Sequence, residues 1–175
     1  MERTVPAVSE TNRLFSEDGY IVRQKYAGGF PYGAFGSDLN GCGWIAVYNL
    51  LHVFDASITP EQVHREMNEK LSYRGMRGTP MSLMRKTLAA HGLVFSLGRG
   101  REAALRLGTA SRGGILRYWE GMEPHFVCYL RLSGDTYRFL NVNERNPEMT
   151  VDFARYLNER PSTPMIRIIA LREAA

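Results

Sequence analysis

The chain has 175 residues, of which 44% are hydrophobic and 23% charged, values ordinary for one soluble globular domain. Its two cysteines are too few for a disulfide framework and lack the spacing of zinc ligands. No apolar run is long enough to span a bilayer, and the N-terminus lacks the pattern of a signal peptide. We therefore expect a cytoplasmic protein without a membrane span or a bound metal.

The net charge of +4 is unevenly distributed along the chain. Residues 65–117 carry eleven basic and three acidic side chains, a net charge of +8. Such a block can attract an acidic partner or contact phosphate. We favour a solvated basic face, because no aromatic-and-basic motif typical of nucleic-acid binding accompanies the block. We expect no specific nucleic acid, whereas an acidic peptide is compatible with this charge.

The first quarter of the chain leads up to one long apolar segment. Residues 1–18 are polar without a sustained period, which predicts an N-terminal arm, and residues 19–175 are assigned to a single domain. Residues 20–26 suggest a short strand, and residues 27–41, with five glycines, suggest a loop. A helix is predicted from about 43 to 54. It is apolar on nearly every face, which is typical of a helix buried inside a domain.

Two helices in the middle of the chain begin with the same signal, a threonine followed by a proline. At Thr59-Pro60, Gln62 completes a capping box, and we predict a helix over residues 59–70. At Thr79-Pro80 the signal recurs before a predicted helix over residues 81–91, which ends at a glycine.

The second half of the chain is mostly predicted strand. In order, we predict a strand at 93–97, a short helix at 101–107, strands at 114–119, 123–132 and 136–142, a helix at 150–157 capped by Thr150, and a closing strand at 165–171. The turn at 133–135 makes two of these strands a hairpin. Helices come first and an antiparallel meander comes late, which is an α+β pattern.

Cys42 begins the apolar helix, between Gly41 and Gly43. At a helix N-terminus, unpaired N–H groups and the helix dipole both favour a thiolate, which is the nucleophilic form. The flanking glycines predict close approach of a substrate backbone to the sulfur. The alternative is that Cys42 is a small buried hydrophobe, a common role for a free cysteine.

A nucleophilic cysteine needs a base within hydrogen-bond reach and a group that orients the base. His52 lies ten residues along the same helix and is too distant. His125 begins a hydrophobic strand, on a rigid element where its ring can lie at the edge of a cleft. Strand alternation directs Cys128 to the opposite face, so we assign Cys128 to the core.

The orienting group is predicted on the neighbouring strand. Pairing around the hairpin turn brings Asn141 roughly opposite the start of the His125 strand, where an asparagine carbonyl can accept from the ring. Asn143 is the alternative. Both asparagines also suit a turn at a strand end, so neither is decisive by itself.

With these residues in place, the sequence resembles the papain-like cysteine peptidases, most closely the compact bacterial branch that includes bacteriocin leader-processing peptidases. The resemblance covers about residues 20–172. The segments that carry it are Gly41–Ala46, Gly78–Leu83, Pro124–Val127, Leu140–Val142 and Val151–Leu157.

The resemblance implies a helical part around the Cys42 helix, packed on a C-terminal antiparallel sheet. It implies Cys42 as the nucleophile, His125 as general base and acid, and Asn141 or Asn143 as the orienting residue, with no cofactor. The implied activity is cleavage of an amide bond in a peptide or protein through an acyl-enzyme. Acyl transfer at the same site and an inactive binding module are the alternatives.

One position departs from the family. The family places a glutamine six residues before the cysteine, where it binds the developing oxyanion, and this sequence has Gly36 there. The predicted donors are therefore the backbone N–H of Cys42 and the side chain of Asn40. Loss of one such donor costs about 100- to 1000-fold in rate.

Overall fold

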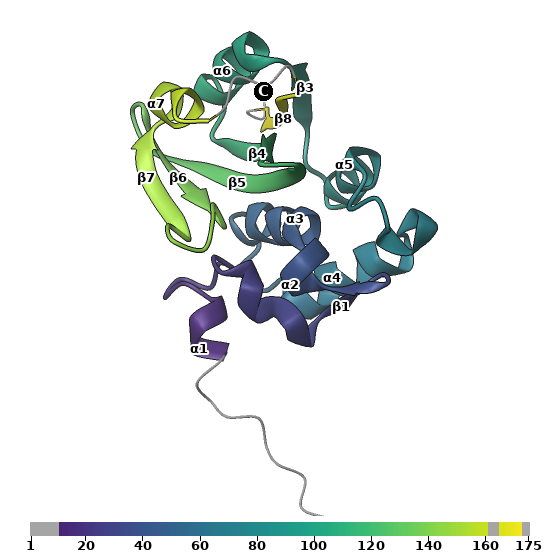
Figure 1. The fold of residues 1–175 in the computed structure, drawn as a ribbon. Coiled ribbons are helices and arrows are strands. Elements are labelled where there is room, and N and C mark those ends of the chain that lie inside the picture. The colour runs from purple at the N-terminus through teal and green to yellow at the C-terminus, as the bar shows by residue number, and fades with distance from the viewer. Residues whose placement is uncertain (1–10, 161–164, 173–175) are drawn as a thin grey trace, which may run out of the picture.

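The computed structural model describes residues 11–160 and 165–172, which place helices on both faces of a six-stranded antiparallel sheet (Figure 1). The predicted α+β class is confirmed. In spatial order, the strands are β3 (Phe95–Arg99), β8 (Arg167–Leu171), β4 (Gly113–Glu120), β5 (Glu123–Ser133), β6 (Thr136–Leu140) and β7 (Glu148–Asp152). Strands β4 to β6 form the predicted meander, β7 extends it beyond the prediction, and β8 inserts between β3 and β4.

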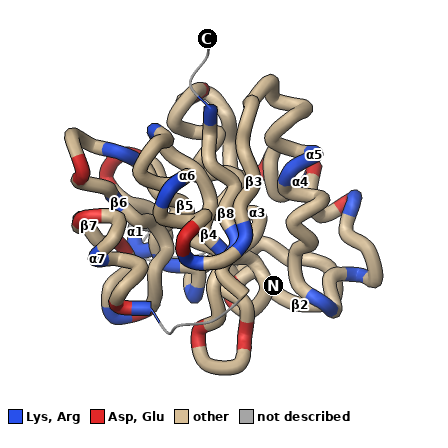
Figure 2. The backbone as a smooth tube through the Cα atoms, turned by 90° about the horizontal axis from the view of Figure 1, so that it is seen from above, with Lys and Arg blue, Asp and Glu red and all other residues tan. Residues whose placement is uncertain are grey.

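The helices divide between the two faces of the sheet. In the view from above, α6 (Arg101–Thr109) and α7 (Phe153–Asn158) lie to the left, and α4 (Pro60–Glu69) and α5 (Met81–Ala90) lie to the right (Figure 2). Between the sheet and the first pair is an aromatic core in which the rings of Phe139 and Tyr156 stack with centroids 3.6 Å apart.

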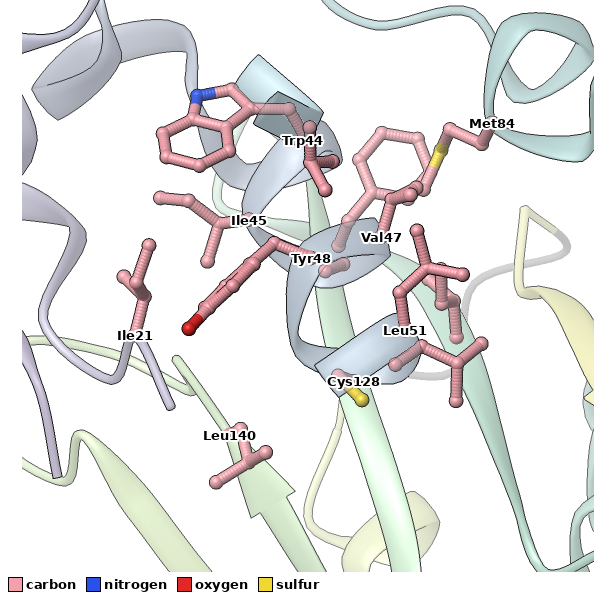
Figure 3. Close-up of a cluster of buried hydrophobic side chains, with 14 of the residues drawn as sticks. Ile21, Trp44, Ile45, Val47, Tyr48, Leu51, Met84, Cys128 and Leu140 are labelled. Carbon is pink, nitrogen blue, oxygen red and sulfur yellow. The ribbon is translucent and has the colours of Figure 1, made fainter. Parts of the chain in front are cut away.

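Helix α3 (Cys42–His52) is the centre of the other face. Every residue from Gly43 to Leu51 is buried, as predicted for a helix apolar on all sides. Its side chains pack on the sheet and on α5, where Cys128, Leu140 and Met84 complete the core (Figure 3). Cys128 therefore lies in the core, as predicted.

The two cap signals behave differently. The Thr59 hydroxyl accepts from the N–H of Gln62, and the Gln62 side chain accepts from the N–H of Thr59, so the capping box is confirmed. Thr79 does not cap α5, because Pro80 occupies the N-cap position. The Thr79 hydroxyl instead donates to the Tyr32 hydroxyl at 3.2 Å.

The predicted helix at 150–157 starts too early. Residues Glu148–Asp152 form β7, in which Val151 pairs with Tyr137, and Asp152 caps α7 by accepting from the N–H of Arg155 at 2.9 Å. A β-branched pair, Thr150 and Val151, favours the strand.

The predicted strand at 20–26 is also wrong. Ile21 makes only an isolated bridge to Phe15, and its N–H and C=O both bond the side-chain amide of Asn49 at 2.8 Å. The 3-10 helix η1 (Gln24–Gly29) follows. A side chain of α3 therefore takes the bonds that a neighbouring strand would have made.

The segments predicted as arm and loop contain short elements. Of the predicted arm, residues 1–10 lie outside the described residues, while α1 (Thr11–Leu14) places Leu14 in the core. The remaining short elements are β1 (Pro31–Tyr32), β2 (Phe35–Gly36), α2 (Ser37–Asn40) and η2 (Ser72–Gly75). None of the helices in the described ranges combines the length and the apolar character needed to cross a bilayer.

Candidate active site

Cys42 is the first residue of α3 and is half-buried. Gly41 joins α2 to α3 with a helical backbone (φ −84°, ψ −8°), so the sulfur lies where one helix ends and the next begins. As the first residue of α3, Cys42 has no acceptor for its N–H within the helix, and no described carbonyl elsewhere in the backbone accepts it. This N–H is therefore available to a ligand.

The flanking glycines serve packing rather than substrate approach. A Cβ atom on Gly43 would lie 2.3 Å from the Thr79 Cβ, and one on Gly41 would lie 2.4 Å from the Ser37 carbonyl oxygen. Both glycines are buried. The expectation that they open a path to the sulfur is corrected: they let α2, α3 and the segment before α5 pack closely.

His125 lies near the start of β5, and its ring is fixed from one side by the main chain of Asn141. The Nε2 atom is 2.8 Å from the Asn141 carbonyl oxygen. Because a carbonyl oxygen can only accept, Nε2 carries the proton, and Nδ1 is the nitrogen left to exchange a proton with Cys42.

Cys42 and His125 are neighbours, and this contact is one of the factors that set the protonation of the ring. Burial lowers the pKa of His125, but the hydrogen bond to Cys42, the charge of that sulfur and the Asn141 carbonyl outweigh it, so the pKa is raised above its ordinary value. A raised pKa favours the imidazolium form, which is the partner that stabilises a thiolate.

Asn141 is buried and has a left-handed backbone (φ 61°), a conformation that asparagine tolerates better than most residues. Its side chain does not bond His125. The Oδ1 atom accepts from the N–H of Gln24 at 3.1 Å, and Nδ2 donates to Gln24 Oε1 at 3.2 Å. Gln24 therefore holds Asn141, and Asn141 holds His125.

Gln24 is a site residue that the sequence analysis missed. Besides its bonds to Asn141, its Nε2 donates to the Asp38 carbonyl at 3.2 Å, which ties η1 to α2, the short helix before Cys42. The amide nitrogen carries a second hydrogen, and Gln24 lines the cleft beside the sulfur. Gln24 precedes Cys42 by eighteen residues and Asn141 by 117, so no local spacing marks it.

At position 36, where the papain-like peptidases have a glutamine, packing leaves no room for a side chain in this protein. A Cβ atom on Gly36 would lie 2.1 Å from Asp38 Oδ1, so no side chain fits without displacing that carboxylate. Asn40, the predicted substitute, donates from Nδ2 to the Gly75 carbonyl at 2.9 Å. Asn40 is not among the residues that line the cleft.

Cys42 and His125 open into a cleft of about 370 Å³. Its lining residues are Arg23, Gln24, Lys25, Asp38, Leu39, Cys42, Glu120, Glu123, Pro124, His125, Asn141, Asn143 and Glu144. Asn143 lies in this lining, but its Oδ1 accepts from the N–H groups of Arg145 and Asn146, so it stabilises a turn. Four of the lining side chains are acidic and two are basic, which makes the cleft wall acidic overall.

The other three histidines bond elsewhere. His52 contacts the Asp18 carbonyl at 3.3 Å, His64 the Pro31 carbonyl at 2.7 Å, and His91 the Glu66 carboxylate at 3.0 Å. Within residues 11–160 and 165–172, no group of three or more His, Cys, Asp and Glu side chains is placed to hold a metal ion.

Comparison with known proteins gives a structural neighbour but no sequence relative. No protein-family model matches the chain, and no curated protein matches it. Among solved structures, the chain is similar to the peptidase domain of Streptococcus ComA, a bi-functional ABC transporter involved in a quorum-sensing pathway. The TM-score is 0.54 with 10% sequence identity, over 77% of this chain and 94% of that one. The chain therefore has the α+β fold of a papain-like peptidase domain.

Proposed function

We propose that this protein is a cysteine peptidase that cleaves an amide bond through an acyl-enzyme on Cys42. The observation that carries the proposal is the contact between Cys42 and His125, in which the second ring nitrogen is held by the Asn141 carbonyl. Cys42, His125 and Asn141 line the same cleft, so a nucleophile, its base and the group that orients the base lie together, as nucleophilic catalysis requires. The fold shared with the ComA peptidase domain supports a peptide as substrate.

In the first half of the reaction, His125 Nδ1 accepts the thiol proton and the Cys42 sulfur attacks the carbonyl carbon. The oxyanion accepts from the N–H of Cys42 and from the second amide hydrogen of Gln24, which take the place of the family's glutamine. Collapse of the intermediate breaks the C–N bond, and His125 returns the proton to the leaving amine. The acyl group remains on Cys42 as a thioester.

In the second half, water attacks the thioester while His125 accepts a proton from it. The C–S bond breaks, the carboxylic acid leaves, and the proton returns to the Cys42 sulfur. An amine in place of water would give acyl transfer at the same site, with the same atoms of the protein.

The test uses a peptide library prepared by digesting a proteome, with all amines blocked, so that each new free N-terminus reports one cleavage. We expect new termini with the wild type and with Cys128→Ala, and none with Cys42→Ala. Cys128 is the matched control, because it is the second thiol of the chain and lies in the core. New termini from Cys42→Ala, or none from the wild type, would show that the proposal is wrong.

Added glycine ethyl ester separates hydrolysis from acyl transfer in the same assay. Hydrolysis leaves new C-termini as free acids even when the amine is abundant. Predominant glycine ethyl ester adducts would identify the protein as an acyltransferase.

A further inference from the structure

Three arginines lie in one row across the sheet, on the face that packs against α3. Arg99 of β3 is in register with Arg167 of β8, and Arg167 is in register with Arg117 of β4. Residues in register on neighbouring antiparallel strands point to the same face, with Cβ atoms about 4.5–5.5 Å apart. Like charges in this arrangement repel, so the row is unfavourable without an anion beside it.

No carboxylate of the described residues neutralises this row. Among the described residues, no Asp or Glu oxygen lies within 4.0 Å of a nitrogen of Arg99, Arg117 or Arg167. The Nε atom of Arg167 is buried and bonds no described residue. A buried donor of a charged group without an acceptor is costly, and a bound anion removes that cost.

The row begins beside the candidate active site. Arg117 is half-buried, with its guanidinium 6.0 Å from the ring centroids of Trp119 and Phe126. Burial and the positive charge of Arg167 lower the pKa of Arg117, whereas the charge of the Cys42 sulfur raises it. The charges of Arg167 and Cys42 therefore both act on Arg117. Phe126, its partner on β5, directly follows His125.

The other end of the row opens into a second groove of about 300 Å³, where β3 and β8 face α5. Arg99 and Arg167 line it together with Arg85 of α5, which is exposed. Met81 and Leu97 supply apolar wall, and Leu97 is 46% exposed. In Figure 2, basic positions are seen on α5 and near β8.

The mixture of guanidinium groups and apolar wall suits a peptide better than a small inorganic anion. The two strand spacings from β4 to β3 amount to roughly 10 Å, which matches about three residues of an extended chain. Arginine presents a fork of donors that matches a carboxylate.

We propose that Arg99, Arg117 and Arg167, with Arg85, form a binding site for acidic side chains of the peptide substrate, on the β3 side of the scissile bond. The proposal rests on the proposed function for the identity of the ligand as a substrate. The cleft that holds Cys42 and His125 is lined by Glu120 and Glu123 and is acidic overall, so the cleft and the arginine row have opposite charge. Such a site fixes the direction in which a substrate binds.

The test measures binding, so that it is independent of catalysis. Fluorescein-labelled hexaglutamate and hexaglutamine are titrated by anisotropy into the Cys42→Ala protein, which cannot form an acyl-enzyme. We expect hexaglutamate to bind at least about tenfold more tightly than hexaglutamine, the effect of one charge-assisted hydrogen bond. We also expect the affinity to fall as sodium chloride is raised.

Variants locate the binding. We expect the single variant Arg99→Gln, at an exposed position, to weaken the binding of hexaglutamate about tenfold or more. We expect the same of the double variant that combines Arg99→Gln with Arg167→Gln. Arg106→Gln is the matched control, because Arg106 is exposed on α6 on the opposite face of the sheet. Arg99→Gln keeps the test valid if the double variant does not fold.

Several results would overturn the proposal: equal affinity for the two peptides, equal weakening by Arg106→Gln, or complete displacement of hexaglutamate by inorganic phosphate at matched ionic strength. Tighter binding of single-stranded oligothymidine through the same arginines would also overturn it, in favour of nucleic acid. Peptide binding that persists when the library assay shows no cleavage would leave this site in place and refute only the peptidase.

Discussion

The imidazole of His125 is held by the main chain of Asn141, whose carbonyl oxygen lies 2.8 Å from the ring Nε2. The side chain of Asn141 faces the other way and pairs with Gln24. The group that holds the imidazole is therefore a backbone atom, whose position depends on the left-handed conformation of Asn141.

This geometry predicts an order of effects at position 141. Asn141→Gly keeps the carbonyl and the positive φ, so we expect it to retain most of the reactivity of Cys42 toward iodoacetamide at neutral pH. Asn141→Val places a β-branched residue at φ 61°, a strain of about 1–3 kcal/mol, and we expect a much larger loss. If both variants lose reactivity equally, the side chain and not the carbonyl is the orienting group.

The raised pKa of His125 predicts how its contribution to stability depends on pH. A group whose pKa is higher in the folded state stabilises fully below its unfolded value, here 6.5, and loses that contribution as the pH rises through the folded value. Urea unfolding of the wild type and His125→Asn should therefore differ more at about pH 5.5 than at about pH 9. A difference that grows with pH would contradict the assigned direction.

Asn49 predicts a stability effect far from the cleft. Its amide satisfies both the N–H and the C=O of buried Ile21, so Asn49→Ala leaves two buried polar groups unpaired. We expect a loss of about 2–4 kcal/mol in the free energy of unfolding. Asn146→Ala, at an exposed position, is the control and should be nearly neutral. A small effect of Asn49→Ala would mean that water replaces the amide.

The β4–β5 hairpin predicts a repulsion that can be measured. Glu120 and Glu123 pair directly across the two strands next to the turn. We expect Glu120→Gln to stabilise the protein by about 0.5 kcal/mol at low salt and to have little effect when Glu123 is already glutamine. Equal effects in both backgrounds would show that the two carboxylates do not interact.

The parts of this fold that the sequence predicts well are those fixed by local chemistry. The apolar run after Cys42 can only be buried, and the Thr59–Gln62 pair defines a helix start wherever it occurs. The β5–β6 hairpin follows from strand alternation and a short turn, which is why Cys128 is correctly assigned to the core.

The errors arise where distant residues decide the local structure. Ile21 resembles a strand residue, but its backbone bonds are taken by Asn49 of α3. Gln24 reaches the site from η1 and meets Asn141 across 117 residues of chain. The arginine row needs the insertion of β8 between β3 and β4, because Arg167 then joins two arginines from the basic block.

The measurement that tests the central claim most directly is the alkylation rate of Cys42 against pH, followed by mass spectrometry, in the wild type and in His125→Ala. Cys128 is the internal control, because burial raises its pKa and shields it in the core. We expect Cys42 to be alkylated faster than a free cysteine at neutral pH, and we expect His125→Ala to lose this rate advantage. A rate for Cys42 that follows the free-thiol profile in both proteins would contradict the paired nucleophile and base.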